Sequence, residues 1–405
     1  MRRVLFTTFG SYGDLFPYLA VGAELRSRGH EVTVGTSPAF RAKVEEAGLA
    51  FHAVRPDVSL DNSELLAYIF DAKKGSERVV RLVASVVRDS YEDTLGAAQR
   101  ADIIVTHPIT FGAVLVARKL RMRWASSVLA PISFMSTYDP PLLPPAPWLT
   151  RSWPFGRSLL GVLFSFGQRS ALPWVAPVLQ LASELGLPPG GNPVFDGSHS
   201  PALVLALYSR LLGGPQPDWP QNTLQTGFAF YNESAVRPLD PELSEFFDQG
   251  APVVFTLGSS AVSAAGDFYR DSFQAVQRLG AHALFLTGSH SQGLPAQLPE
   301  GVLVRPYAPH SLVFPRAAAI VHQGGVGTTA QALRAGRPML IVPFAHDQFD
   351  NAERLKRLGA AEVIYRSKYS SRNCERQLGK LLSGKEYGNA ALGAAATMRA
   401  ETGAA

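Results

Sequence analysis

Cysteine is almost absent from this chain of 405 residues, with Cys374 as its single example. One thiol excludes an internal disulfide and any metal site built from several cysteines, and we expect a reducing, cytoplasmic location. Long apolar runs are missing as well. No stretch approaches the about 20 apolar residues of a membrane span, and the run Val4–Thr8 is too short for a signal peptide. We therefore expect neither a transmembrane segment nor a leader.

Charge is also sparse. Lysine, arginine, aspartate and glutamate make up 18% of the chain, the net charge is +5, and the arginines are scattered. Without a long basic run, nucleic acid is not an expected partner, and the charge predicts only a mild preference for anionic ligands. A hydrophobic content of 46% is typical of a folded globular protein, and the length fits about two domains.

One stretch near the C-terminal end has a clear local pattern. The apolar run 317–321 predicts a buried strand, residues 322–327 are rich in glycine, and Thr328–Ala335 is a good helix-forming segment that Gly336 and Pro338 end. A strand that turns through glycines into a helix presents free N–H groups and a dipole of roughly half a charge to an anion. A tight connection without a ligand is the alternative.

Strand and helix patterns alternate from Val4 to Leu129 and again from Pro252 to Leu382, which predicts an α/β fold with doubly wound parallel sheets. Pro17–Arg28 is expected to be the first helix, preceded by a loop. Between the two series, Pro131–Pro189 is rich in proline and aromatic residues. It covers the sheet or lines a pocket for a flat apolar molecule. Contact of its Trp148 and Trp153 with a membrane is a weaker alternative.

Several motifs follow one another along the chain: Gly10-Ser11-x-Gly13-Asp14, Leu257-Gly258-Ser259, Tyr307-Ala308-Pro309-His310, His322-x-Gly324-x-x-Gly327-Thr328, Gly336-x-Pro338, and Asp347-Gln348 with Asn351. In this order and spacing the chain resembles glycosyltransferase family 1, in particular its bacterial macrolide, glycopeptide and sterol branches. The resemblance covers nearly the whole chain. It implies the GT-B fold, in which two Rossmann-like domains face a central cleft.

The resemblance implies a division of labour between the domains. Residues 1–212 would bind the acceptor, 213–222 would be the linker, and 223–385 would bind a nucleotide sugar. Residues 386–405 would form a helix that packs back towards the N-terminal domain. The expected partners are a nucleotide-sugar donor and a small-molecule acceptor, and the expected assembly is a monomer or a weak homodimer.

The resemblance also implies which residues hold the donor. His322 and the loop amides would bind the diphosphate, Tyr307 would stack on the base, and Asp347 with Gln348 would bind sugar hydroxyls. The full predicted donor set is Ser11, Gly258, Ser259, Tyr307, His310, His322, Gly324, Gly325, Gly327, Thr328, Asp347 and Gln348. Two alternatives stay open: His322 as a satisfied core histidine, and Asp347 as a helix cap.

Departures from the family pattern leave uridine and thymidine both open. Tyr307 replaces the family's tryptophan, His310 replaces its glutamine, and Gln331 is the nearest candidate for its ribose-binding glutamate. Because the chain has no Asp-x-Asp triplet, we expect no metal and no other cofactor. The diphosphate leaving group would be stabilised by the donors of the glycine turn.

The resemblance implies that Asp14, at a position where family members carry His or Asp, is the general base. A neutral hydroxyl is a poor nucleophile, and a positioned base supplies about 10²–10⁴-fold. Asp14 as a cap of the helix that starts near Pro17 is the alternative, and both roles are compatible. His107 follows the predicted strand 103–105, near the position where relatives with a histidine base carry a supporting aspartate. The resemblance therefore places it near Asp14, where it would orient the carboxylate or contact the acceptor.

The predicted function is an inverting, nucleotide-sugar-dependent hexosyltransferase that acts on a hydrophobic small molecule such as a polyphenol or flavonoid, a polyketide or a terpenoid. A sterol or lipid glycosyltransferase at a membrane surface is the runner-up. A nucleotide-sugar epimerase or a non-catalytic helper protein is the alternative from another class. The particular sugar and acceptor stay open.

Overall fold

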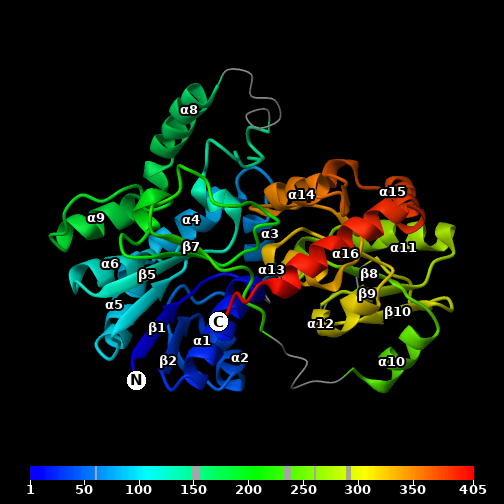
Figure 1. Cartoon of the computed structure of the whole chain (residues 1–405), viewed down its shortest axis with the longest axis horizontal. Helices are drawn as coiled ribbons and strands as arrows, with labels where there is room; N and C mark the ends of the chain where they lie inside the picture. Colours follow the sequence, from blue (N-terminus) through cyan, green and yellow to red (C-terminus); the bar gives the residue numbers. More distant parts are fainter. Residues whose placement is uncertain (60–61, 148–155, 232–238, 260, 289–292) are drawn as a thin grey trace. The chain divides into compact units, whose positions relative to one another are not determined.

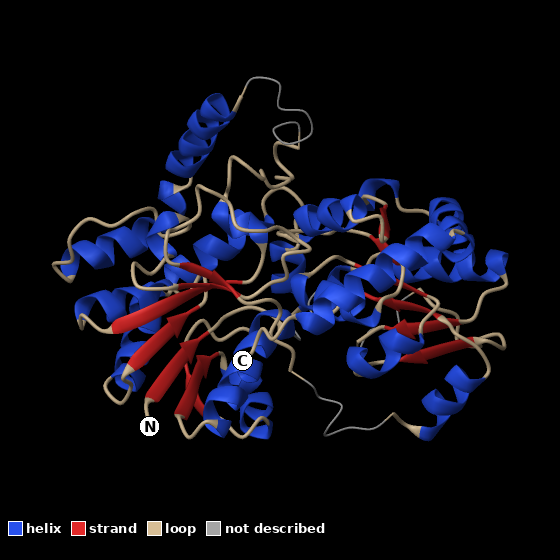
Figure 2. Ribbon diagram, viewed as in Figure 1, coloured by secondary structure: helices blue, strands red, loops and turns tan. Residues whose placement is uncertain are grey.

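The computed structural model describes residues 1–59, 62–147, 156–231, 239–259, 261–288 and 293–405. The chain forms two compact units, each with one parallel sheet and surrounding helices (Figures 1 and 2). Unit 1 comprises Met1–Asn62, Lys73–Tyr231 and Thr402–Ala405, and unit 2 comprises Ser63–Ala72 and Asn232–Glu401. The predicted α/β class with two parallel sheets is therefore confirmed.

The sheet of unit 1 has the strand order β3-β2-β1-β4-β5-β6-β7, and every neighbouring pair is parallel. Its strands are β1 Arg3–Thr7, β2 Glu31–Thr36, β3 Ala50–Ala53, β4 Ile103–Thr106, β5 Arg123–Val128, β6 Val204–Ala206 and β7 Thr223–Gln225. The chain winds outward from β1 to β3 and then restarts on the other side of β1 with β4. The carboxyl ends of β1 and β4 therefore border a topological switch point, where α/β sheets bind ligands.

Helices and short 3-10 turns connect these strands. They are α1 Tyr12–Ser27, η1 Pro38–Phe40, α2 Arg41–Glu46, α4 Gly75–Ser85, α5 Val87–Ala98, α6 Phe111–Lys119, η2 Pro131–Phe134, α8 Arg157–Ser170, η3 Leu172–Val175, α9 Ala176–Glu184 and η4 Asp196–Ser198. Apolar residues of α5 and α6 pack with Leu5 of β1 and Ile104 of β4 in one buried cluster. This core holds the two central strands. His107 directly follows β4, and Asp14 lies in the first turn of α1, the helix after β1.

The sheet of unit 2 has the order β10-β9-β8-β11-β12-β13 and is also parallel throughout. Its strands are β8 Val253–Thr256, β9 Ala283–Leu286, β10 Val302–Arg305, β11 Ala319–His322, β12 Met339–Ile341 and β13 Ala361–Val363. The order reverses between β8 and β11. The glycine-rich turn after β11 therefore lies at the switch point of this sheet.

The helical segments of unit 2 include one from the N-terminal part of the chain. They are α3 Ser63–Ile69, α10 Pro241–Asp248, η6 Ala261–Ala264, α11 Phe268–Leu279, α12 His310–Val313, η7 Phe314–Arg316, α13 Val326–Ala335, α14 Gln348–Arg357, η8 Arg366–Lys368, α15 Ser371–Ser383 and α16 Lys385–Ala400. None of the helices in the described part of the chain is long and apolar enough to cross a bilayer.

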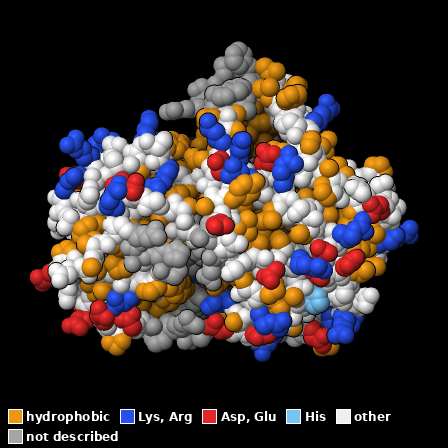
Figure 3. Space-filling view, turned by 180° about the vertical axis from the view of Figure 1, so that it is seen from behind, with side chains coloured by type: hydrophobic (Ala, Val, Ile, Leu, Met, Phe, Trp, Pro, Cys, Tyr) orange, Lys and Arg blue, Asp and Glu red, His pale blue; other side chains and the backbone are white. Residues whose placement is uncertain are grey.

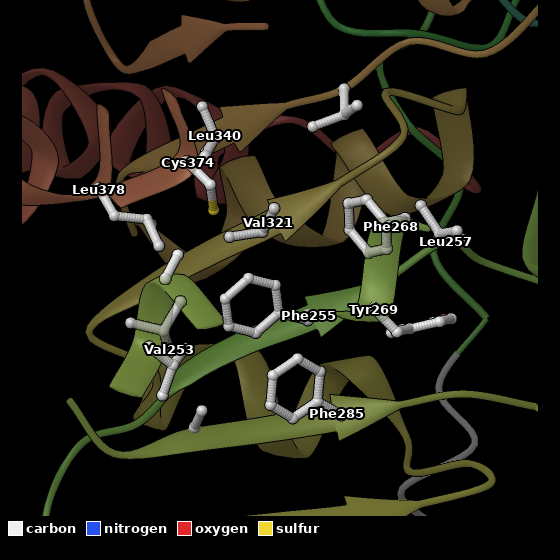
Figure 4. Close-up of a cluster of buried hydrophobic side chains, with 14 of the residues drawn as sticks. Val253, Phe255, Leu257, Phe268, Tyr269, Phe285, Val321, Leu340, Cys374 and Leu378 are labelled. Atoms are coloured by element: carbon white, nitrogen blue, oxygen red, sulfur yellow. The ribbon is translucent and has the colours of Figure 1, made fainter. Parts of the chain in front are cut away.

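A dense core supports the strands of unit 2 (Figure 4). Side chains of β8, β9 and β11 meet those of α11 and α15, and the rings of Phe255 and Phe285 stack with centroids 4.6 Å apart. Burial of each such large apolar side chain contributes about 1.5–3 kcal/mol. Cys374 lies in this core, fully buried, and burial raises the pKa of its thiol to about 12. The lone cysteine is therefore a packing residue.

The boundaries between the units differ from the predicted ones. Residues 213–222 are not a linker between units, because they lie within unit 1 and lead into the edge strand β7. The segment 63–72 belongs to unit 2, where Leu66 is buried and Phe70 packs against the core. Helix α16 packs on α13 and α15 of unit 2, and only Thr402–Ala405 returns to unit 1. Trp148 and Trp153, for which membrane contact is the weaker alternative, lie outside the described residues.

Candidate active site

One group of candidate residues lies in unit 1, at the start of α1; this helix begins at Tyr12 and not, as predicted, at Pro17. Ser11 is the N-cap of the helix, and Asp14 is the third residue of its first turn. Their side chains form a capping box, in which Asp14 Oδ2 accepts hydrogen bonds from Ser11 N at 2.7 Å and Ser11 Oγ at 2.9 Å. The predicted loop at Asp14 is wrong for this reason, and the capping role is confirmed. Pro17 lies inside the helix.

Gly10 makes room for the Asp14 carboxylate. Its φ of +137° is rare for residues with a side chain, and a Cβ at this position would lie 2.3 Å from Asp14 Oδ2. The glycine therefore serves the geometry of the carboxylate as well as the turn after β1.

His107 lies beside Asp14, directly after β4, and its backbone N–H bonds to Thr7 O of β1. Its Nε2 is 3.4 Å from Asp14 Oδ1, and its Nδ1 accepts a hydrogen bond from Ile109 N at 3.3 Å. Because Nδ1 accepts, the proton of the neutral ring is on Nε2, from which it is donated to Asp14. The imidazole thus orients the carboxylate.

The electrostatics of this pair favour an ionised Asp14. Burial raises the pKa of its carboxyl, but the hydrogen bond from His107 and the two bonds from Ser11 outweigh that effect and lower the pKa below its ordinary value. The Asp14 side chain is 30% exposed, whereas that of His107 is 7% exposed. Of the two residues, Asp14 is thus the one that an incoming molecule can reach.

A second group of candidate residues lies in unit 2, at its glycine-rich turn. His322 ends β11, is fully buried, and accepts a hydrogen bond at Nδ1 from Gly324 N at 3.1 Å. Burial, followed by the neighbouring His310, lowers the pKa of His322 to about 3. The neutral ring therefore carries its proton on Nε2, which is buried and has no partner among the described residues.

Three further polar atoms around this turn are buried without a hydrogen-bond partner in the described part of the chain. They are Gln323 Oε1, Thr329 Oγ1 and Asn351 Oδ1. Helix α13 starts here at a Gly325 N-cap that makes no side-chain cap bond, and the first amides of a helix have no partner within it. Buried polar atoms are normally paired, so this concentration indicates a site for a polar ligand.

The turn after β8 contacts the same glycine turn. A Cβ at Gly258, which has a φ of +68°, would lie 2.5 Å from Gln323 Nε2, and one at Gly325 would lie 2.9 Å from the same atom. The amide of Gln323 therefore fits between two glycines and bonds to Thr328 Oγ1 at 3.4 Å. The half-buried Ser259 follows on the first of these turns.

The loop after β12 contacts the glycine turn from its other side. Asn351 Nδ2 donates to Gly324 O at 2.9 Å and to Asp347 Oδ2 at 2.7 Å, so one buried amide joins the turn to the Asp347 carboxylate. Asp347 occupies the N-cap position of α14, as the capping alternative predicts, but it makes no side-chain cap bond to that helix. Gln348 Oε1 accepts from Phe344 N and Ala345 N, so its oxygen shapes the loop.

The remaining donor positions lie near the ends of β10 and β11. Tyr307 is 48% exposed after β10, as a stacking platform requires. His310 begins α12 and stacks on Phe314 with centroids 4.4 Å apart. Gln331 is half-buried on α13. Contact of these residues with a nucleotide stays a prediction.

Three residues that shape the site have structural roles that the motifs did not reveal. Gly10 and Asn351 occur in the motifs but were not assigned functions, and Gln323 was passed over as a variable position. A glycine directly before a polar motif is a usable signal for close approach. The bonds of Asn351 depend on contacts between distant segments, which a motif does not show.

A parallel sheet with a glycine-rich turn at its switch point, and a second sheet with an oriented carboxylate at its own, define a two-domain α/β enzyme of the GT-B type. Two family models match the chain. Residues 4–117 match the N-terminal domain of glycosyltransferase family 28, and residues 273–404 match the C-terminal domain of erythromycin biosynthesis protein CIII-like proteins.

Relatives support the same assignment over most of the chain. The O-mycaminosyltylonolide 6-deoxyallosyltransferase of Streptomyces fradiae is 30% identical over 391 residues, covering 89% of this chain and 84% of that protein. The sterol 3-beta-glucosyltransferase of Yarrowia lipolytica is 28% identical over 385 residues, which are 88% of this chain but 25% of that longer protein. The chain therefore belongs to glycosyltransferase family 1 and is a nucleotide-sugar-dependent glycosyltransferase.

Solved structures share the fold. The glycotransferase of kitacinnamycin superposes with a TM-score of 0.73 at 19% identity and covers 100% of this chain and 96% of its own. The Streptomyces sp. SF2575 glycosyltransferase SsfS6, complexed with thymidine diphosphate, gives a TM-score of 0.62 at 19% identity, with 99% and 96% covered. At these identities the likeness establishes the GT-B fold alone.

Proposed function

We propose that this enzyme moves a sugar from a UDP- or TDP-sugar to a hydroxyl of a hydrophobic small molecule, with inversion at the anomeric carbon. The observation that carries the proposal is the Asp14 carboxylate, ionised, partly exposed, and held by Ser11 and His107. Natural-product acceptors are favoured because the relative from Streptomyces fradiae is an O-mycaminosyltylonolide 6-deoxyallosyltransferase.

Asp14 is the proposed general base. As the acceptor oxygen attacks the anomeric carbon, its proton passes to Asp14, the bond from that carbon to the diphosphate breaks, and the diphosphate departs with the electron pair. The lowered pKa of Asp14 makes it a weak base, so proton transfer is expected late, when the acceptor oxygen has become acidic through bonding to the sugar. A phenol needs less assistance than an aliphatic alcohol.

The donors around the glycine turn are proposed to hold the diphosphate. A neutral His322 presents Nε2–H, and the first amides of α13 present further donors to the charge that builds on the leaving group. Thymidine diphosphate fits the donor class, since it is bound by the solved relative SsfS6. We expect transfer without added metal, because the chain has no Asp-x-Asp triplet, and EDTA should leave the rate unchanged.

The test is incubation with UDP- and TDP-sugars and a panel of phenolic and aliphatic acceptors, with the anomeric configuration of the product read by NMR. Asp14→Asn should abolish transfer while the nucleotide still binds in calorimetry. Asp102→Asn is the matched control, because that carboxylate pairs with Arg3 outside the site. Undiminished transfer by Asp14→Asn would refute Asp14 as the base, and a retained anomeric configuration would refute the single displacement.

A sterol acceptor is the second candidate, favoured by the likeness to the sterol 3-beta-glucosyltransferase. Sterols included in the same acceptor panel distinguish the two classes. Sterol glucoside as the preferred product would replace the natural-product assignment without changing the roles of Asp14 and His322.

A further inference from the structure

Helix α8 (Arg157–Ser170) has apolar residues on two faces, and only one of these faces packs on the described residues of unit 1. The inner face carries Leu160 and Phe164, which are one turn apart and 1% and 5% exposed. They pack on neighbouring apolar side chains, namely Met135, Leu143, Ala146 and Leu163. This contact explains how the helix is attached to its unit.

The outer face carries Leu159, Val162 and Phe166, which are 45%, 63% and 73% exposed. Their spacing of three and four residues places them in one stripe along the helix. The helix extends away from the sheet of its unit, and hydrophobic side chains gather on this projection in the space-filling view (Figures 1 and 3). A contiguous exposed stripe of this kind marks a binding surface.

The charges of α8 favour an anionic partner. Arg157 and Arg169 lie near the two ends of the helix, both exposed, and its 14 residues include no aspartate or glutamate. The Arg157 guanidinium lies 4.3 Å from the ring centre of Tyr138, itself 45% exposed. By the helical period, Arg169 lies beside the outer stripe, whereas Arg157 lies on the inner face with Leu160 and Phe164. A basic side chain beside an apolar stripe is typical of helices that lie in the headgroup region of a bilayer.

The size of the stripe argues against a second protein as the occupant. Its three side chains expose on the order of 300 Å² of apolar surface, well below the ~800 Å² per partner of a stable protein interface. Insertion into a bilayer has no such threshold, because affinity adds up from apolar area and electrostatic attraction.

We propose that the outer face of α8 docks on the surface of an anionic lipid bilayer, with Leu159, Val162 and Phe166 among the acyl chains and Arg169 at the phosphates. The helix would lie along the membrane, and the protein would be bound reversibly. This property is independent of the acceptor assigned above, and a membrane-bound enzyme would meet apolar acceptors where they concentrate.

The test uses the full chain with sedimented vesicles of phosphatidylcholine, with or without a minority of phosphatidylglycerol. The parent should co-sediment with the anionic vesicles, and Val162→Ser/Phe166→Ser should bind at least about tenfold more weakly. Arg169→Gln should weaken binding about fivefold and make it less dependent on salt. The matched controls are Leu392→Ser, at a 58% exposed position of α16, and Arg372→Gln, exposed on α15.

Three outcomes would overturn the proposal: absence of binding to anionic vesicles, equal binding to both vesicle types, or equal losses in the α8 and control variants. Sedimentation equilibrium distinguishes a membrane-binding face from an interface between two copies of the chain. If Val162→Ser/Phe166→Ser turns a dimer into a monomer without any vesicle binding by the parent, the face is an interface between two copies. Circular dichroism and thermal unfolding verify that each variant is folded.

Discussion

The sharpest test of the Asp14 site is the substitution Gly10→Ala, because it disturbs the carboxylate without removing it. The new Cβ would lie 2.3 Å from Asp14 Oδ2, and real Cβ atoms essentially never come closer than 3.0 Å to another atom. The oxygen must therefore move by about 0.7 Å, which breaks its alignment with Ser11 N and Oγ. Displacement of a reacting group by about 1 Å costs as much as 10²-fold in rate.

We therefore expect the kcat of Gly10→Ala to fall by about 10- to 100-fold, or about 1.4–2.7 kcal/mol of transition-state stabilisation. Calorimetric affinity for the nucleotide should be unchanged, since the nucleotide is proposed to bind unit 2. The assay is steady-state transfer to a phenolic acceptor.

Backbone strain is a separate effect that the control must match. Gly29→Ala introduces a side chain at a φ of +83°, in the same unit, with nothing within 4 Å of the new Cβ. Both variants should lose roughly 1–2 kcal/mol of stability from the left-handed backbone. Parental turnover in Gly10→Ala, or an equal loss in Gly29→Ala, would refute the reasoning about the carboxylate.

Three further predictions concern the histidines and the glycine turn. His107→Ala removes a hydrogen bond that lowers the pKa of Asp14; the pKa should rise, and activity should be lost at a higher pH as the solution is acidified, which a pH profile of kcat/KM checks. His322→Ala should weaken nucleotide-sugar binding at least about tenfold. The parental affinity for a nucleotide sugar, in which both phosphates are esterified, should be flat between about pH 5.5 and 8, because the pKa of His322 is about 3; a titration near neutrality that His322→Ala abolishes in calorimetry would contradict this. Gly324→Ala places a Cβ 2.9 Å from Ile341 Cγ2 and should cost about 2–4 kcal/mol in thermal unfolding; Gly359→Ala, with a φ of +73° and a nearest contact of 3.7 Å, should cost only about 1–2 kcal/mol.

The elements with strong local patterns were predictable. The strands predicted at 103–105 and 317–321 correspond to β4 and β11, and the glycine turn after β11 leads into a helix that ends at Ala335 as expected. The start of α1 was predicted wrongly because two local signals compete. Pro17 is a good first helical residue, yet the Ser11–Asp14 capping box starts the helix earlier.

Contacts between distant segments were harder to predict. His107 is 93 residues from Asp14, and the resemblance alone suggested their proximity; the physical reason is that β1 and β4 are neighbours in the sheet. No local pattern in the sequence predicts that α3 packs in unit 2. Its apolar residues indicate that the helix needs a core, but they do not specify which of two cores receives it.

Helix α3 has a consequence for exchanging halves between related enzymes. Leu66 and Phe70 pack within unit 2 although they are encoded far upstream of it, and Phe70 makes an edge contact with His346, next to Asp347. A chimera joined only near residue 231 would therefore combine α3 of one parent with the Asp347 loop of the other. Transplanting residues 63–72 together with 232–401 keeps that contact native, so exchanging unit 2 as a whole calls for a crossover at both ends of each segment, four in all.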